Sequence, residues 1–94
     1  MGKVADAIEV LRTRAATMSG DELEKLLRDL QFDVRPTSSG KHQVVTHDGL
    51  EWFISTSFDK GHKKQMLPKY PQLIRKVLIQ YQVQLETILG ERHA

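Results

Sequence analysis

The stretch HQVVTHDGLEWFIST, residues 42–56, decides the fold. Asp48-Gly49 is the strongest two-residue hairpin signal in the sequence. It follows a valine-containing segment, residues 42–46, and precedes residues 51–56, which are rich in aromatic and β-branched side chains. We therefore expect an antiparallel hairpin of two strands over these ranges. Side-chain alternation along the first strand separates two faces, one with His42, Val44 and Thr46 and the other with Gln43, Val45 and His47.

A short edge strand is expected immediately upstream of the hairpin. Residues 32–35 alternate apolar with charged side chains and stop at Pro36, which cannot donate to a central ladder. Residues 37–40 then have the composition of a turn. The sequence thus predicts three short strands in succession.

Helical patterns surround the strands. A first apolar stripe predicts a helix up to Met18, and it consists of Val4, Ile8, Leu11, Ala15 and Met18. The run Ser19-Gly20-Asp21-Glu22 has the form of a capping box, which starts a second helix. Its apolar stripe is Leu23, Leu26, Leu27 and Leu30.

The third strand leads to a lysine-containing loop and then a long helix. Residues 59–69 contain Gly61 and Pro68 without apolar periodicity, so they are expected to form a loop. Pro71 suits the first turn of a helix, and Gly90 suits its end. Helical spacing between them predicts one continuous third helix, with Leu73, Ile74, Val77, Leu78, Tyr81, Leu85 and Ile88 on its apolar side. The fold class is therefore α+β.

Length and composition limit the classes of protein to consider. With 94 residues the chain has room for one domain, residues 1–94, and its 39% hydrophobic and 28% charged residues are typical of a folded, soluble protein. No apolar run reaches the roughly 20 residues that span a bilayer, and residues 1–6 lack the pattern of a secretory leader. We expect a cytoplasmic protein without membrane contact. The absence of cysteine excludes disulfides, thiolate metal sites and cysteine nucleophiles.

Positive charge is concentrated in the middle of the chain. Between Val34 and Lys76 there are eight basic and three acidic residues, whereas the segment before Val34 is net negative. Four lysines, Lys60, Lys63, Lys64 and Lys69, fall within ten residues ahead of the last helix, where ammonium groups could bind phosphates. A solvated surface loop is an equally good interpretation of this lysine cluster.

His42 is the first candidate for chemistry, because imidazole changes its protonation nearest neutral pH and can move a proton at a phosphate. A lone strand histidine is more often a surface or partly buried residue. Trp52 and Phe53 could stack on bases, although core and edge packing is the more common use of such residues. His42, His47 and His62 with Asp48 and Asp59 match no known ligand spacing, so we expect neither a metal site nor a cofactor.

Several motifs together resemble the HicA family of toxin-antitoxin ribonucleases over roughly residues 19–79. They are the leucine-rich helix DELEKLLRDLQF (residues 21–32), Gly40-Lys41-His42, Asp48-Gly49, the loop KGHKK (residues 60–64) and LIRKVL (residues 73–78). The resemblance implies a fold like a double-stranded-RNA-binding domain, with a helix, three antiparallel strands and a helix. It also implies metal-independent cleavage of messenger RNA and a HicB-like antitoxin as partner.

The family histidine carries over to His42, with Lys41, Lys60, Lys63, Lys64 and Lys69 as expected contacts to RNA phosphates. Two positions depart from the family pattern. Lys41 stands where serine or threonine is usual, and Gln43 replaces a frequent second histidine. Either departure points toward altered or absent catalysis.

Residues 1–18 and 80–94 extend beyond the matched core as an additional helix and a prolonged last helix. Their apolar stripes must be buried, by enlarging the core, by packing on each other or across a homodimer. The leading hypothesis is an RNA-cleaving, mRNA interferase-like toxin. The alternatives are a non-catalytic RNA-binding module on the same fold and a protein-interaction domain that uses its amphipathic helices.

Overall fold

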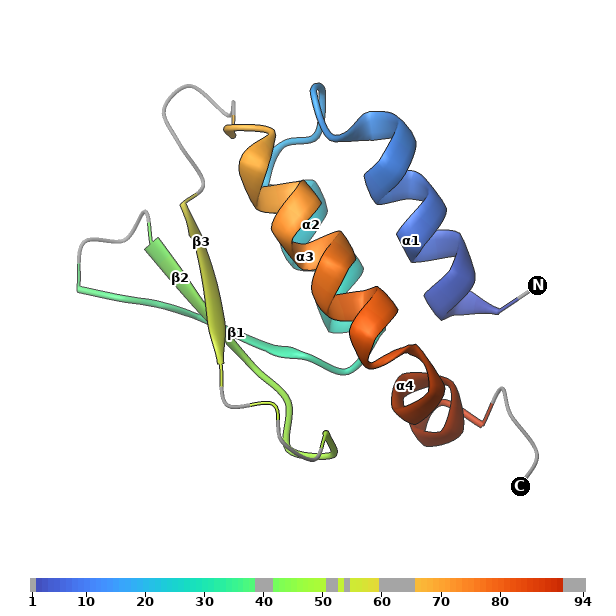
Figure 1. Ribbon diagram of the computed structural model, residues 1–94. Helices are drawn as coiled ribbons and strands as arrows, with labels where there is room; N and C mark the ends of the chain where they lie inside the picture. Colours follow the sequence, from blue (N-terminus) through green and yellow to red (C-terminus); the bar gives the residue numbers. More distant parts are fainter. Residues whose placement is uncertain (1, 39–41, 51–52, 54, 60–65, 91–94) are drawn as a thin grey trace.

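The computed structural model describes residues 2–38, 42–50, 53, 55–59 and 66–90. These residues form an α+β arrangement in which the helices lie on one side of a three-stranded antiparallel sheet (Figure 1). In chain order the elements are α1 (Lys3–Arg14), α2 (Gly20–Asp29), β1 (Asp33–Pro36), β2 (His42–Thr46), β3 (Thr56–Asp59), α3 (Lys69–Gln80) and α4 (Gln82–Ile88). No described helix is long and apolar enough to cross a membrane.

The sheet has the order β1-β2-β3, so the expected edge strand is indeed at an edge. In the β1–β2 pair Val34 lies opposite Val45, and Pro36 lies opposite Gln43. In the β2–β3 pair His42 lies opposite Asp59, and Gln43 lies opposite Phe58. Because successive side chains point to opposite faces, this register fixes which residues share a face.

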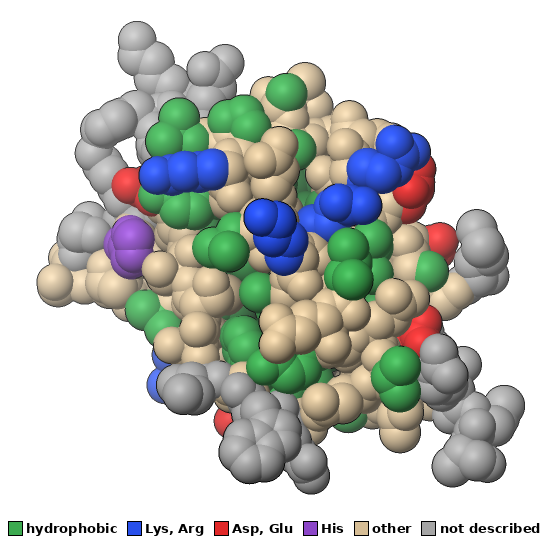
Figure 2. Space-filling view, viewed as in Figure 1, with side chains coloured by type: hydrophobic (Ala, Val, Ile, Leu, Met, Phe, Trp, Pro, Cys, Tyr) green, Lys and Arg blue, Asp and Glu red, His purple; other side chains and the backbone are tan. Residues whose placement is uncertain are grey.

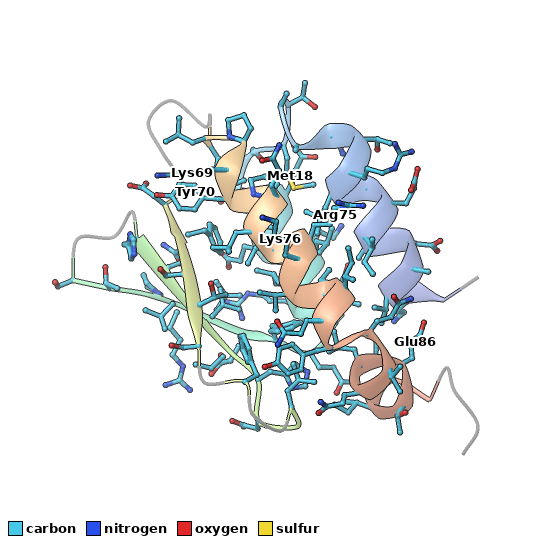
Figure 3. The ribbon with its side chains drawn as sticks, in the orientation of Figure 1. Met18, Lys69, Tyr70, Arg75, Lys76 and Glu86 are labelled. Atoms are coloured by element: carbon cyan, nitrogen blue, oxygen red, sulfur yellow. The ribbon has the colours of Figure 1, made fainter. Side chains whose placement is uncertain are left out.

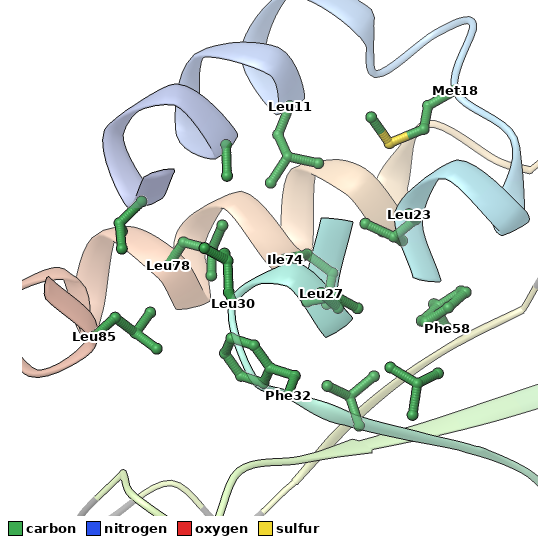
Figure 4. Close-up of a cluster of buried hydrophobic side chains, with 14 of the residues drawn as sticks. Leu11, Met18, Leu23, Leu27, Leu30, Phe32, Phe58, Ile74, Leu78 and Leu85 are labelled. Carbon is green, nitrogen blue, oxygen red and sulfur yellow. The ribbon is translucent and has the colours of Figure 1, made fainter. Parts of the chain in front are cut away.

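The core lies between the inner face of the sheet and three helices. α2 and α3 cover that face, and α1 packs on the far side of α3 from the sheet, so the apolar side chains are stacked in layers (Figures 1 and 4). The part of the core nearest the sheet contains Phe32, Phe58, Leu23, Leu27 and Ile74 (Figure 4). The layer further out contains Leu11, Met18, Leu78 and Leu85.

The capping box at the start of α2 is present as predicted. The Glu22 backbone N–H donates to the Ser19 hydroxyl at 3.1 Å, and the Ser19 backbone N–H donates to the Glu22 carboxylate at 3.2 Å. The other end of α2 is closed by backbone hydrogen bonds from Gln31 to Arg28 and from Phe32 to Leu27. This is the Schellman arrangement, and it holds Gln31 at a φ of 70°.

The predicted two-residue hairpin is wrong. Asp48 and Gly49 do form a turn, with a backbone hydrogen bond from Leu50 to His47, but β3 begins only at Thr56, opposite Val45. The expected strand over residues 51–56 therefore shares only Thr56 with the observed one. Leu50 is buried and Phe53 packs against the core, so the connection needs extra length to bring both side chains inward.

The helix boundaries also differ from prediction. α1 ends at Arg14 and Ala15–Thr17 form a turn, although Met18 is buried in the core as expected. The single long last helix is divided at Tyr81, whose backbone leaves the helical region and whose ring contacts Phe53 edge-on at 5.6 Å between centroids. Gly90, at a φ of 74°, ends the chain's last helical turn, as predicted.

The two additional helical segments enlarge the core. α1 contacts both α3 and α4, and its residues Val4, Ala7 and Leu11 join Leu85 of α4 in one apolar cluster. Their apolar stripes are thus covered within a single chain, as the core-enlargement interpretation expects. Because these faces of α1 and α4 are buried inside the chain, they are not available to a partner protein.

Candidate functional site

Among the described residues, helices cover one face of the sheet and leave the other face open (Figure 1). Val34, Gln43, Val45 and Phe58 are buried beneath the helices, whereas none of the residues that alternate with them is fully buried. No described helix lies over this second face (Figure 1). The open face carries Asp33, Arg35, His42, Val44, Thr46, Ser57 and Asp59. Polar side chains that are partly exposed on a regular sheet are suited to contact a ligand.

His42 occupies one end of this open face and is held by a neighbouring strand. Its Nε2 lies 3.2 Å from the hydroxyl oxygen of Ser57, which is the diagonal position on β3. Asp59 is directly opposite His42 in the register. When Nε2–H donates to the hydroxyl, Nδ1 has a lone pair and can accept a proton. The arrangement therefore presents a partly exposed, oriented imidazole.

His47 has a different role from His42. It is only 7% exposed and lies on the covered face. The Gly49 backbone N–H donates to its Nδ1 at 3.1 Å, so Nε2–H is the donor to the Leu30 carbonyl, 3.2 Å away. Its ring also meets Phe32 edge-on at 4.7 Å. With both nitrogens engaged inside the protein, His47 is a structural residue.

Most of the predicted phosphate contacts fall on residues without a described position. Lys41, Lys60, Lys63 and Lys64 lie outside the described residues, as do His62 and Trp52. Lys69 is described and exposed, at the first residue of α3, with its ammonium 5.1 Å from the centroid of the Tyr70 ring. The strand ends that carry His42 and Asp59 lie on the same side of the molecule as the start of α3 (Figure 1).

A separate groove of about 540 Å³ lies between α1 and α2. Its floor is apolar and its rim carries charges of both signs, and none of the predicted site residues lines it. On the rim, Arg14 pairs with Glu22 at 2.6 Å. The hydrogen bond from the Ser19 backbone, followed by the one from Arg14, lowers the pKa of Glu22 below its usual value. These interactions stabilise the start of α2 and have no connection to His42.

Metal ligands do not gather anywhere in the described part of the chain, where no group of three His, Asp or Glu side chains is placed to hold an ion. On the open face, the guanidinium of Arg35 is paired with Asp33 at 2.9 Å. Besides this pair, the described residues of the face include an imidazole, two hydroxyls and the carboxylate of Asp59, which has an interaction within the protein. Such groups can move protons and accept or donate hydrogen bonds.

Sequence reasoning missed Ser57, the partner of His42. It placed β3 too early, and residues 57 and 58 were therefore left outside any strand. The signal that could have found it is the alternation in Thr56–Asp59, where Phe58 is the only apolar side chain and must point inward. That alternation puts Ser57 on the open face.

Comparison with family models, with curated proteins and with solved structures finds no match to this chain.

Proposed function

We propose that this chain is an RNA-binding, toxin-like ribonuclease of the HicA kind, acting in the cytoplasm without a metal ion. The observation that carries the proposal is the partly exposed imidazole of His42 on the open sheet face, oriented by Ser57 at 3.2 Å. The order helix, three antiparallel strands, helix from α2 to α3 agrees with a fold like a double-stranded-RNA-binding domain. The resemblance of residues 19–79 to HicA supplies the substrate class.

In the proposed reaction a ribose 2′-hydroxyl attacks the adjacent phosphorus. Nδ1 of His42 takes the hydroxyl proton as the O2′–P bond forms. The P–O5′ bond then breaks, and the departing 5′ oxygen takes a proton from water, which leaves a cyclic phosphate and a 5′-hydroxyl. The protonated His42 gives its proton to the hydroxide that remains. Lys41, Lys63 and Lys64 would offset the charge that develops on the phosphate oxygens, with Lys60 and Lys69 as further phosphate contacts. A HicB-like antitoxin is the proposed regulator.

The test is cleavage of a labelled single-stranded RNA by the purified chain in the presence of EDTA. His42→Ala should lower the rate by about a hundredfold to ten-thousandfold, the usual contribution of a general acid or base. Ser57→Ala should lower it less and shift its pH profile, because Ser57 orients the ring and does not itself move the proton. Thr46→Ala, on the same face of β2, is the matched control and should cleave like the wild type. Equal rates in His42→Ala and wild type would refute the assignment.

One observation favours a second function, the binding of RNA without cleavage. Gln43, which stands where the family often has a second histidine, is 3% exposed on the covered face. Gln43 therefore lies on the opposite face of the sheet from His42, and the described residues of the open face include no second histidine. Under this alternative the chain would shift RNA in a gel and leave it intact. His42→Ala would then weaken binding only slightly, and expression of the chain in a bacterium would not arrest growth.

A further inference from the structure

The outward side of α3 carries exposed apolar residues together with cations. Leu73 is 42% exposed and Ile79 46% exposed, although both are large apolar side chains. Lys69 and Lys76 lie on the same side of the helix, since seven residues make roughly two turns. We call the four residues Lys69, Leu73, Lys76 and Ile79 the α3 stripe. Figure 3 shows Lys69 and Lys76 on α3, with Arg75 beside Lys76 on the side toward α1.

Positive charge predominates around the α3 stripe. Residues 66–85, all described, contain three lysines and arginines and no acidic residue, and the acidic group whose charge acts on Arg75 is the carboxylate of Glu9 on α1. In the space-filling view, blue side chains stand among green ones over this face, and red ones appear only toward its margins (Figure 2). The buried Nε of Arg75 has no hydrogen-bond partner among the described residues. The face is thus apolar and positive, with few carboxylates of its own.

We propose that the α3 stripe docks an acidic amphipathic helix of a partner protein. Carboxylates seven residues apart on such a helix would match Lys69 and Lys76, which are about 10.5 Å apart along the axis at 1.5 Å per residue. Apolar side chains between them would cover Leu73 and Ile79 in the manner of helix-in-groove recognition. The match of charge and of spacing together identifies the occupant.

The positions of the lysines argue against the two other anionic surfaces that a positive face could meet. Around the helix axis Lys69 and Lys76 fall between Leu73 and Ile79, at roughly 100° per residue. A helix that lies in a lipid surface instead keeps its cations on a polar face opposite the apolar one. RNA phosphates would pair with the lysines but give Leu73 and Ile79 nothing apolar to contact.

The second copy of this chain is a poorer occupant when it uses the same surface. A two-fold pairing of the stripe with itself puts four lysines into one interface, and the stripe has no carboxylate to offset their charge. Antiparallel pairing about the middle of α3 sets Lys76 opposite Leu73 and Lys69 opposite Gln80, so neither lysine meets a carboxylate. Lys69 of the stripe is also a proposed phosphate contact, whereas Leu73, Lys76 and Ile79 are not. The experiment below changes only these last three residues of the stripe, so it does not depend on the ribonuclease activity.

The experiment uses the full chain labelled with ¹⁵N and a designed three-heptad helical peptide. The peptide has glutamate at one position of each heptad and leucines three and four residues later, and it is added up to millimolar concentration. We expect amide shifts confined to α3 and its immediate neighbours. Leu73→Ser, Ile79→Ser and Lys76→Glu should each weaken binding by about tenfold or more. Val83→Ser and Lys25→Glu, which change exposed residues of α4 and α2, are the matched controls and should bind as the wild type does.

Charge reversal makes the test specific. A peptide with lysine in place of glutamate should fail to bind the wild type and should recover binding to Lys76→Glu. Folding of each variant is checked by its far-ultraviolet circular dichroism. The proposal is overturned if the acidic peptide causes no shifts in α3 or if Leu73→Ser binds it unchanged. It is also overturned if anionic vesicles or single-stranded RNA compete with the peptide for the stripe and their binding is weakened by Leu73→Ser as much as the peptide's binding is.

Discussion

His47 offers the sharpest test of the distinction between a structural and a chemical histidine. Its ring is buried on the covered face of the sheet and connects the end of β2 to the end of α2 through the Leu30 carbonyl. His42 lies on the opposite face, and its ring makes one described hydrogen bond, to the hydroxyl of Ser57. Alanine at position 47 should therefore reduce stability, and alanine at position 42 should leave most of it intact.

The size of the effect follows from the contacts. His47→Ala removes two hydrogen bonds, each contributing about 1 kcal/mol net. It also removes the edge contact with Phe32, which is worth about 0.5–1.5 kcal/mol. We expect a loss of about 3 kcal/mol in the free energy of unfolding, a large share of the 5–15 kcal/mol typical of domains. His47→Phe keeps the ring and loses the two hydrogen bonds, so it should lose about 2 kcal/mol.

Urea unfolding followed by circular dichroism gives the free energy of unfolding of His47→Ala, His47→Phe and His42→Ala on one scale. His42→Ala should lose less than about 1 kcal/mol, as changes on an open face usually do. A low cleavage rate in His47→Ala would then reflect unfolded protein, and its remaining folded fraction should cleave normally. The reasoning fails if His47→Ala is as stable as His42→Ala, or if His47→Phe matches the wild type.

Two further predictions concern the ends of α2. The Ser19 backbone N–H and Arg14 lower the pKa of Glu22 in the folded state below the ordinary value of 4.5. Ionised Glu22 should therefore stabilise the fold fully above pH 4.5, and this contribution should disappear as the pH falls through the lowered pKa. Glu22→Gln should accordingly flatten the acid limb of a stability-against-pH curve, whereas Asp29→Asn, an exposed change at the other end of α2, should leave the limb steep. Gln31 sits at a φ of 70°, where a side chain costs about 1 kcal/mol relative to glycine. Gln31→Gly should raise the melting temperature by several degrees in a domain of this size, whereas Gln31→Ala should not. Equal melting temperatures for the two variants would contradict the assignment of strain to position 31.

The candidate site was predictable in part. His42 and its face were available from the alternation of residues 42–46, and the structure places the ring there. Ser57 was not found, because the strong Asp48-Gly49 signal assigned the third strand to residues 51–56. The same alternation put His47 on the other face but gave no indication that Leu30 and Gly49 would engage both of its nitrogens. Those partners come from segments far apart in the chain or from a turn whose shape depends on the core.

Local chemistry in the sequence by itself determined the start of α2, the edge position of β1, the place of Pro71 in the first turn of α3 and the end of α4 before Gly90. In each case the residues that act are within a few positions of one another, so their hydrogen bonds and backbone preferences need no tertiary contact. Only the tertiary structure decided where β3 begins and where the last helix divides. Burying Leu50 and Phe53 lengthened the connection between β2 and β3, and the contact of Tyr81 with Phe53 lies where α4 separates from α3. The Asp48-Gly49 turn closes one backbone hydrogen bond, worth about 1 kcal/mol net, whereas covering a large apolar side chain is worth about 1.5–3 kcal/mol, so packing prevailed over the turn signal in the connection between β2 and β3.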